Sequence, residues 1–120
     1  MARQIIFHAE YFLDFYKDLD VKVKSKIQYV FELIKQVERV PEKFRAPMIG
    51  HDGLFEIRIE YQSNIYRVFC CFDEGRLVVL FNGFQKKTQK TPKGEIERAM
   101  RLMEEYFELK NLKNQKDDRL

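Results

Sequence analysis

The sequence has few of the residues that mark secreted, metal-binding or membrane proteins. Its only two cysteines, Cys70 and Cys71, are adjacent. Neighbours in a strand point to opposite faces of a sheet, so we expect no disulfide between them and infer a reducing compartment. The two histidines, His8 and His51, have no cysteine or carboxylate at the spacing of a metal site. We therefore expect no metal and no other cofactor.

Long apolar runs and several enzyme motifs are also missing. No uninterrupted apolar segment approaches the roughly 18 residues of a membrane span. The N-terminal MARQIIFHAEYF lacks an apolar region followed by a small-residue cleavage site. These absences predict a soluble, cytoplasmic protein with no membrane partner. No Walker loop, GxSxG elbow or dinucleotide fingerprint is present, which disfavours nucleotide hydrolysis and serine hydrolase chemistry.

The length of 120 residues fits one compact domain, since single domains usually have roughly 100–200 residues. We place this domain at residues 1–109. Residues 110–120, KNLKNQKDDRL, are polar and mixed in charge. We expect them to form a frayed or disordered C-terminal tail.

Apolar spacing predicts the helices. After a short strand at residues 3–8, spacings of three and four predict two helices that join near KDLD, with Asp20 capping the second. Pro41 and Pro47 close this helical region. A last helix is expected after Thr91 as N-cap and Pro92 in its first turn. The apolar positions of the first two helices are Phe12, Tyr16, Leu19, Val23, Ile27, Val30, Ile34 and Val37, and those of the last are Ile96, Ala99, Met100, Met103 and Phe107.

Period-two alternation from Leu54 predicts a strand with Ile57 and Ile59 on one face and Glu56, Arg58 and Glu60 on the other. Residues 65–72 and 76–84 are two further strands, separated by turns at 63–64 and 73–75. Three consecutive strands with short turns form an antiparallel meander. The whole order predicts an α+β domain with helices packed on an antiparallel sheet.

Positive charge gathers after the last strand. The net charge of +3 is modest, yet FNGFQKKTQKTPKGEIERA contains Lys86, Lys87, Lys90 and Lys93 before its first acidic residue, Glu95. Lysines beside a helix N-terminus would add to an anion-binding site. A solvated loop is the alternative interpretation.

Two arginines of the meander are further candidates. Arg58 either pairs with a neighbouring glutamate at the surface or belongs to an anion site. Arg67 shares a face with Phe69 and Cys71, so it lies at a sheet edge, pairs with a carboxylate, or projects into a concave site, where its planar fork would match a phosphate. If these arginines lie near the lysines, the sheet carries a basic groove.

Two tyrosines and one histidine each have a functional and a structural interpretation. Tyr61 and Tyr66 flank a turn, where they either stack on bases or pack in the core or at its edge. His51 beside Asp52 is either a general acid or base, or part of a turn between the glycines of GHDG.

Residues 53–99 resemble the phage-derived HigB-like branch of the RelE/ParE toxins of bacterial type II toxin–antitoxin systems. The shared features are a G-L-x-E-x-R strand opening, an aromatic–Arg pair in the next strand, a VVLLHGF-like strand and KKTQKTP before a helix. The resemblance implies a RelE-like fold and a metal-independent, ribosome-dependent endoribonuclease. Such an mRNA interferase cleaves mRNA in the ribosomal A site. It also implies a cognate helix-turn-helix antitoxin, and operator DNA bound through the antitoxin complex.

Carried over by position, the resemblance implies that the catalytic candidates are Arg58, Arg67, Lys86 and Lys87. Arg67 would clamp the phosphate, and Lys86 or Lys87 would stabilise charge or protonate the leaving group. The candidate RNA-binding residues are Lys90, Lys93, Tyr61 and Tyr66.

The chain departs from the family pattern at two places. Asn82 replaces the histidine of the family's HGF, and no motif positions Tyr106 as the C-terminal tyrosine of other branches. Two other functions stay open. One is a ParE-like toxin that acts on DNA gyrase, and the other is a non-catalytic partner that helps the antitoxin bind operator DNA.

Overall fold

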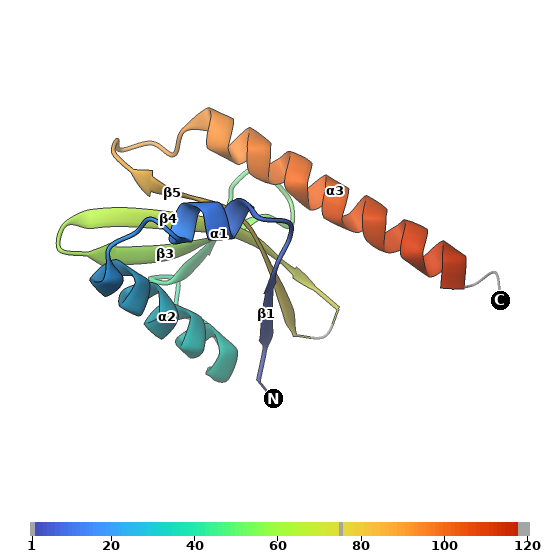
Figure 1. Ribbon diagram of the computed structural model, residues 1–120, viewed down its shortest axis with the longest axis horizontal. Coiled ribbons are helices and arrows are strands. Elements are labelled where there is room, and N and C mark those ends of the chain that lie inside the picture. The colour runs from blue at the N-terminus through green and yellow to red at the C-terminus, as the bar shows by residue number, and fades with distance from the viewer. Residues whose placement is uncertain (1, 75, 118–120) are drawn as a thin grey trace.

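A five-stranded sheet forms the middle of the molecule in the computed structural model, which describes residues 2–74 and 76–117 (Figure 1). The strands follow the spatial order β1-β5-β4-β3-β2. The elements in chain order are β1 (Gln4–Phe7), α1 (Tyr11–Tyr16), α2 (Val21–Gln36), β2 (Arg45–Pro47), β3 (Phe55–Tyr61), β4 (Asn64–Asp73), β5 (Leu77–Lys86) and α3 (Lys93–Asp117). The α+β class expected from the sequence is confirmed.

The sheet is mixed, whereas the sequence predicts an antiparallel one. β3, β4 and β5 form the expected antiparallel meander, but β1 pairs in parallel with β5, from Gln4 opposite Leu77 to Phe7 opposite Leu80. The fifth strand, β2, pairs antiparallel with the start of β3 and was not predicted. It ends at Pro47, and proline within a sheet is confined to edge strands such as this one. Gly75, in the predicted turn at 73–75, lies outside the described residues.

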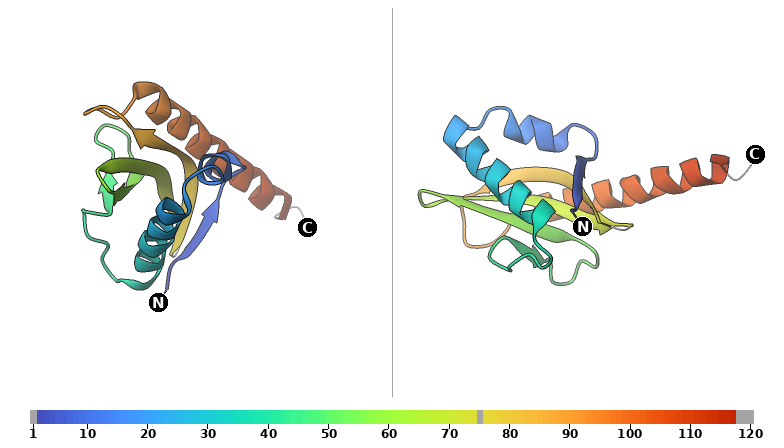
Figure 2. Two further views of the ribbon diagram at one scale, coloured as in Figure 1. Left: turned by 60° about the vertical axis from the view of Figure 1, so that its left-hand side comes forward. Right: turned by 90° about the horizontal axis from the view of Figure 1, so that it is seen from below.

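Helices α1 and α2 cover one face of the sheet (Figure 2). The predicted break between them is confirmed, because the side chain of Asp20 accepts a hydrogen bond of 2.8 Å from the backbone N–H of Lys22 and caps α2. The buried residues of α2 keep the predicted helical spacing: they are Val23, Ile27, Val30, Phe31 and Ile34. They pack on strand residues that alternate toward this face, such as Ile57, Ile59 and Val68. This packing fixes which side chains the strands turn toward the other face.

Helix α3 packs on the opposite face, mainly over β5 and β4. The carbonyl of Pro92 accepts from the N–H of Ile96 (3.3 Å), so Pro92, rather than the expected Thr91, precedes the first helical residue, Lys93. The amide of Asn82 donates to the backbone oxygen of Glu95 (3.1 Å) and to its carboxylate (2.9 Å). These bonds tie the start of α3 to β5.

The C-terminal half of α3 is held by a polar cluster of Asp73, Tyr106 and Lys110. The ammonium of Lys110 lies 2.9 Å from both carboxylate oxygens of Asp73, and the hydroxyl of Tyr106 donates to Oδ2 at 2.7 Å. Burial acts to raise the pKa of Asp73, but the hydrogen bonds from Lys110 and Tyr106 outweigh it and lower that pKa. Burial and the bond to Asp73 raise the pKa of Tyr106. The cluster joins α3 to the end of β4.

The expected frayed tail is helical where it is described. α3 continues past Leu109 to Asp117, and residues 118–120 lie outside the described part. The polar composition of this segment does not indicate the ion pair of Lys110 with Asp73, because Asp73 belongs to a strand distant in the sequence. As far as the structure describes them, the helices include none that is long and apolar enough to cross a membrane.

Gly83 sets how closely α1 approaches β5. A Cβ at this position would lie 2.5–2.9 Å from three ring atoms of Phe15, and that ring also packs beside Phe12 and Tyr66. We expect Gly83→Ala to lower the free energy of unfolding by about 1–3 kcal/mol because of this overlap, measured by urea denaturation. Gly94→Ala is the matched control, since no atom lies within 4 Å of its added Cβ. Equal stability of Gly83→Ala and wild type would contradict this packing.

Asp73 predicts a pH dependence of stability. Because its pKa is lowered in the folded state, the unfolded chain takes up the proton first as pH falls. The stability that Asp73 adds over Asp73→Asn should be complete above the unfolded pKa of about 3.9 and shrink as pH falls toward the folded pKa. Urea denaturation of both proteins at a series of pH values checks this, and Tyr106→Phe should show an intermediate dependence. A stability difference that stays constant down to the acid limit of folding would contradict the role of the cluster.

Candidate nucleic-acid interface

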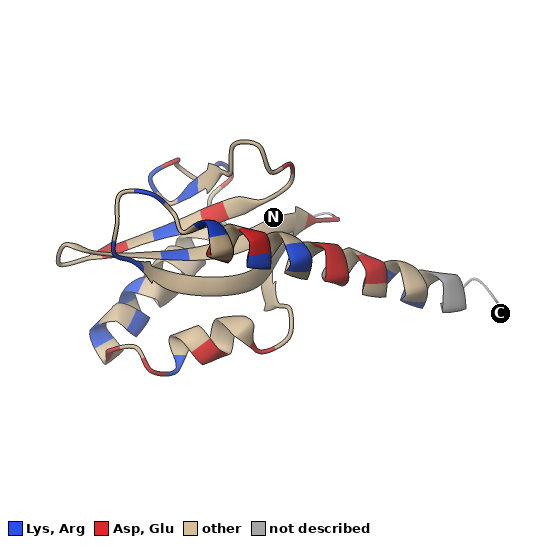
Figure 3. Cartoon of the chain, turned by 90° about the horizontal axis from the view of Figure 1, so that it is seen from above, with Lys and Arg blue, Asp and Glu red and all other residues tan. Residues whose placement is uncertain are grey.

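Three of the predicted cationic residues meet on the face of the sheet that α3 covers only in part. In the strand register, Arg58 of β3 lies directly opposite Arg67 of β4. The next row toward the β3–β4 turn brings Lys86 of β5 opposite Ile65. Neighbouring strands are about 4.8 Å apart and alternate residues share a face, so Arg58, Arg67 and Lys86 occupy adjacent rows of one surface. Figure 3 shows lysine and arginine on these strands and on the loop that precedes α3.

Glu56 bridges the two arginines. Arg58 Nε donates to Glu56 Oε1 at 3.0 Å, and Arg67 Nε lies 3.7 Å from the same oxygen. Like charges directly opposite in a sheet repel, and a carboxylate between them offsets that repulsion. The exposed fractions of Glu56 and Arg67 are 6% and 7%, whereas Arg58 is half-buried. From the sequence, Glu56 was expected only as a partner of Arg58. The cross-strand register shows that it is also a partner of Arg67.

The charge of Arg67 is incompletely neutralised. Its Nη1 donates to the backbone oxygen of Tyr66 at 3.2 Å, but among the described residues neither Arg67 Nε nor Glu56 Oε2 has a hydrogen-bond partner, although both are buried. Burial lowers the pKa of Arg67, the Glu56 carboxylate counteracts this, and Arg58 lowers the pKa further. Arginine stays protonated in proteins. This face therefore holds two guanidinium groups with one carboxylate shared between them, and Glu60, farther along β3, adds a weaker negative charge near Arg67. Arg67 Nε still lacks a hydrogen-bond partner among the described residues, a setting that favours a further anion.

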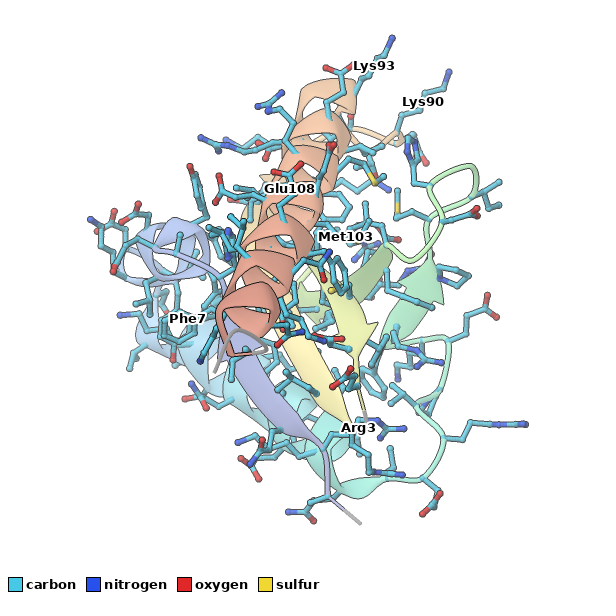
Figure 4. All side chains as sticks on the ribbon, turned by 90° about the vertical axis from the view of Figure 1, so that its right-hand side faces the viewer. Arg3, Phe7, Lys90, Lys93, Met103 and Glu108 are labelled. Atoms are coloured by element: carbon cyan, nitrogen blue, oxygen red, sulfur yellow. The ribbon has the colours of Figure 1, made fainter. Side chains whose placement is uncertain are left out.

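The lysines continue this surface toward α3. Lys86 and Lys87 line a hollow with Ser63 and Ile65, at the end of the sheet where the arginines lie. Lys90 and Lys93 are exposed and extend away from the body of the molecule (Figure 4). The side chain of Lys93 is 91% exposed and lies 4.0 Å from Glu97. Lys86 and Lys87 thus adjoin the arginines, and Lys90 and Lys93 lie farther along the chain toward the helix. We call Arg58, Arg67, Lys86 and Lys87 the cationic surface.

The two tyrosines proposed to bind RNA lie on the other side of the sheet. Tyr66 is only 5% exposed and belongs to the core under α1 and α2. Tyr61 is half-buried and packs against the same core. The structure therefore does not bring them together with the cationic surface, and core packing describes their surroundings. Alternation explains this, because Tyr66 and Arg67 are neighbours in one strand and must point to opposite faces.

His51 and Asp52 also lie apart from the cationic surface. They occupy the loop before β3, at the opposite end of that strand from Tyr61. The loop is closed by a hydrogen bond of 2.9 Å that the backbone N–H of Met48 donates to the carbonyl of Leu54. Its two glycines, Gly50 and Gly53, both have φ +85°. Glycine is the residue that adopts this conformation without strain. These features describe a tight turn.

Other residues singled out by the sequence have structural contacts. Asn82 is buried and anchors α3 through Glu95. Cys70 and Cys71 are free and point into the two different cores. Burial, together with Asp73, raises the pKa of Cys71 to about 12, so its thiol is a poor nucleophile at neutral pH.

Among residues 2–74 and 76–117, no three His, Cys, Asp or Glu side chains gather as a metal site would require.

Glu56→Gln tests the bridge. The substitution removes the shared carboxylate and leaves a nearly buried guanidinium without its counter-ion, so we expect the free energy of unfolding to fall by about 1–3 kcal/mol. Glu60→Gln, four residues farther along β3 on the same face but exposed, should change it by less than about 0.5 kcal/mol. Chemical denaturation of the two variants measures the difference. Equal effects would show that Glu56 does not hold the arginines.

The family to which the chain belongs follows from comparison with known proteins. The family model described as "Phage derived protein Gp49-like (DUF891)" matches residues 14–104. That range begins in α1, ends within α3 and contains the whole cationic surface. A comparison with curated proteins gives no significant match. Because the matched range covers most of the chain, the protein belongs to the family of phage-derived Gp49-like proteins.

Proposed function

We propose that the chain is the toxin of a type II toxin–antitoxin system, in the HigB-like branch of the RelE/ParE toxins, and that it is a ribosome-dependent endoribonuclease. The observation that carries the proposal is the pair Arg58 and Arg67, directly opposite in the sheet and bridged by Glu56. Lys86 in the next row adds a third positive charge. Membership in a phage-derived family and the motifs of residues 53–99 support the toxin assignment.

The reaction that suits such a surface is transesterification within RNA. The 2′-hydroxyl loses its proton to a base and its oxygen attacks the adjacent phosphorus. The bond between phosphorus and the 5′-oxygen breaks, and the 5′-oxygen takes up a proton, so the products are a 2′,3′-cyclic phosphate and a 5′-hydroxyl. The transition state carries two negative charges on the phosphoryl group. Fixed positive donors at a developing anion contribute roughly 3–4 kcal/mol each. Because the reaction needs charge stabilisation, a surface rich in arginine and lysine is appropriate.

Each residue of the cationic surface has a role in this proposal. Arg67, held by Glu56 and by the Tyr66 carbonyl, clamps the phosphate with its planar fork. Arg58, more exposed, binds a second oxygen of the same phosphate or the next one. Lys86 or Lys87 stabilises the developing charge or protonates the leaving 5′-oxygen. Glu56 acts as a positioning residue, because it fixes the direction of both guanidinium groups.

The partners follow from the same proposal. The substrate is mRNA in the ribosomal A site, and cleavage there stops translation in the cytoplasm. A cognate helix-turn-helix antitoxin neutralises the toxin, and the complex binds operator DNA. Lys90 and Lys93, exposed beside the cationic surface, contact the RNA backbone without taking part in the reaction. Surface lysines act mainly through phosphate charge and carry no sequence information.

Mapping of mRNA 5′ ends after brief induction in a bacterial host tests the function. Wild type should produce new ends inside translated frames, and these should disappear when translation is blocked. Arg67→Lys keeps the charge but loses the fork, so we expect at least a roughly 100-fold loss of cleavage. Lys87→Ala should also reduce cleavage, and it is exposed, so folding is preserved. Lys113→Ala, an exposed lysine in the C-terminal half of α3, is the control and should cleave like wild type.

The outcomes separate the candidate functions. Growth arrest without new mRNA ends would contradict the nuclease and favour DNA gyrase as the target. Full cleavage by both Arg67→Lys and Lys87→Ala would place the reaction elsewhere on the molecule. Circular dichroism and binding of the antitoxin by each variant show that a loss of cleavage reflects the site and not unfolding.

A further inference from the structure

A second cationic region lies around the outer edge of β3. β2 pairs with residues 55–57 of β3, and the N–H of the next residue, Arg58, donates to the carbonyl of Phe44 at 2.8 Å. There a small hollow is lined by Lys26 of α2, by Lys43 and Phe44 before β2, and by Arg58 and Glu60 of β3. Arg58 therefore belongs both to the cationic surface and to this hollow. The two regions are continuous through that one side chain.

Two of the lysines at this edge lie beside aromatic rings. The ammonium of Lys26 is 5.3 Å from the ring centre of Tyr29, and that of Lys43 is 5.5 Å from the ring centre of Phe44. Tyr29 is 56% exposed. Surfaces that bind single-stranded nucleic acid combine positive charges, which follow the backbone, with aromatic faces on which bases stack. A duplex keeps its bases stacked inside, so an exposed ring beside a lysine favours a single strand.

The charge balance at this edge also favours an anion. Glu60 is the carboxylate that lines the hollow, against the three cations Lys26, Lys43 and Arg58. No ion pair of the described residues involves Lys26 or Lys43, whereas Lys35, farther along the same helix, is 3.1 Å from Glu32. Figure 3 shows further lysines on α2. Lys22 and Lys24 of the same helix likewise form no ion pair among the described residues, but only Lys26 of α2 lines the hollow with Arg58.

We propose that Lys26, Tyr29 and Lys43 form an edge track that binds single-stranded RNA flanking the phosphate held by Arg58 and Arg67. The inference rests on the proposed function and extends its site around the free edge of the sheet. From β5 to β3 the path crosses two strand spacings, about 10 Å, before it reaches the track. A few nucleotides would occupy only the cationic surface, and a longer strand would occupy both.

The test is the salt dependence of RNA binding, measured by fluorescence anisotropy on the full chain. The probes are labelled single-stranded RNAs of about 3 and about 15 nucleotides, 2′-O-methylated so that they cannot be cleaved. Each phosphate contact to a single strand adds about 0.7 to the slope of log affinity against log salt. For the long probe, Lys26→Gln combined with Lys43→Gln should lower the slope by about 1.4. For the short probe it should have no effect.

Two further variants separate the track from general charge. Lys35→Gln removes the same charge from the same helix and should leave the slope unchanged. Tyr29→Ala should weaken binding of the long probe about ten- to hundredfold without changing the slope, because stacking involves no phosphate. If Lys35→Gln lowers the slope by about 0.7, the amount expected for one phosphate contact, the effect is long-range charge and the track is wrong.

The remaining outcomes distinguish failure of the track from failure of the proposed function. If Arg67→Gln weakens binding of the long probe and the double lysine variant does not change it, the track is wrong and the cationic surface is retained. Absence of binding of either probe by wild type at low salt overturns both. An equal slope change with a duplex DNA probe would show that the edge does not select single-stranded RNA.

Discussion

Two guanidinium groups face each other across β3 and β4, and one nearly buried carboxylate keeps them there. The arrangement is unfavourable by itself, because Arg58 and Arg67 are directly opposite in the sheet and like charges at such positions repel. Glu56 offsets the repulsion through a single oxygen that approaches both arginines. The other carboxylate oxygen and Arg67 Nε form no hydrogen bond with the described residues. An anionic ligand would complete this incomplete neutralisation.

The position of the pair follows from the two cores. α1 and α2 fill one face with Ile57, Ile59 and Val68, so alternation must turn Arg58 and Arg67 toward the other. α3 covers that face chiefly over β4 and β5, and its contacts hold it there. Asn82 binds the start of the helix, and Asp73 binds its second half. Because α3 is fixed at its start and in its second half, Arg58 on β3 stays partly exposed and the lysine loop stays beside it.

Much of this fold follows from local patterns. The three-residue and four-residue spacings predicted both long helices, Asp20 predicted the break between α1 and α2, and alternation from Leu54 predicted the meander and the face of Arg58. The parallel pairing of β1 with β5 depends on contacts distant in sequence, which no local pattern contains. β2 was not predicted because Pro41 and Pro47 indicated only the end of the helical region. The C-terminal end of α3 was not predicted because Lys110 pairs with Asp73, which belongs to a strand distant in the sequence.

The site was predictable to the same extent. The lysine run and the two arginines stood out as charge without an evident partner, and three of them share one surface. Tyr66 packs in the core, one of the two alternatives that the sequence left open, because alternation puts it on the face opposite Arg67. The bridge between the arginines needed the cross-strand register, since Glu56 and Arg67 belong to different strands. The proposed reaction rests on the motif resemblance together with this charge arrangement.

Incubation of the purified chain with mRNA in a reconstituted bacterial translation system tests the central claim most directly. The account predicts cleavage of the mRNA only when it is bound to translating ribosomes, without any added cofactor, and fragments that carry a 5′-hydroxyl at the new end. Arg67→Lys should leave the mRNA intact under the same conditions. Intact mRNA with the wild-type chain, or equal cleavage by wild type and Arg67→Lys, would contradict the account.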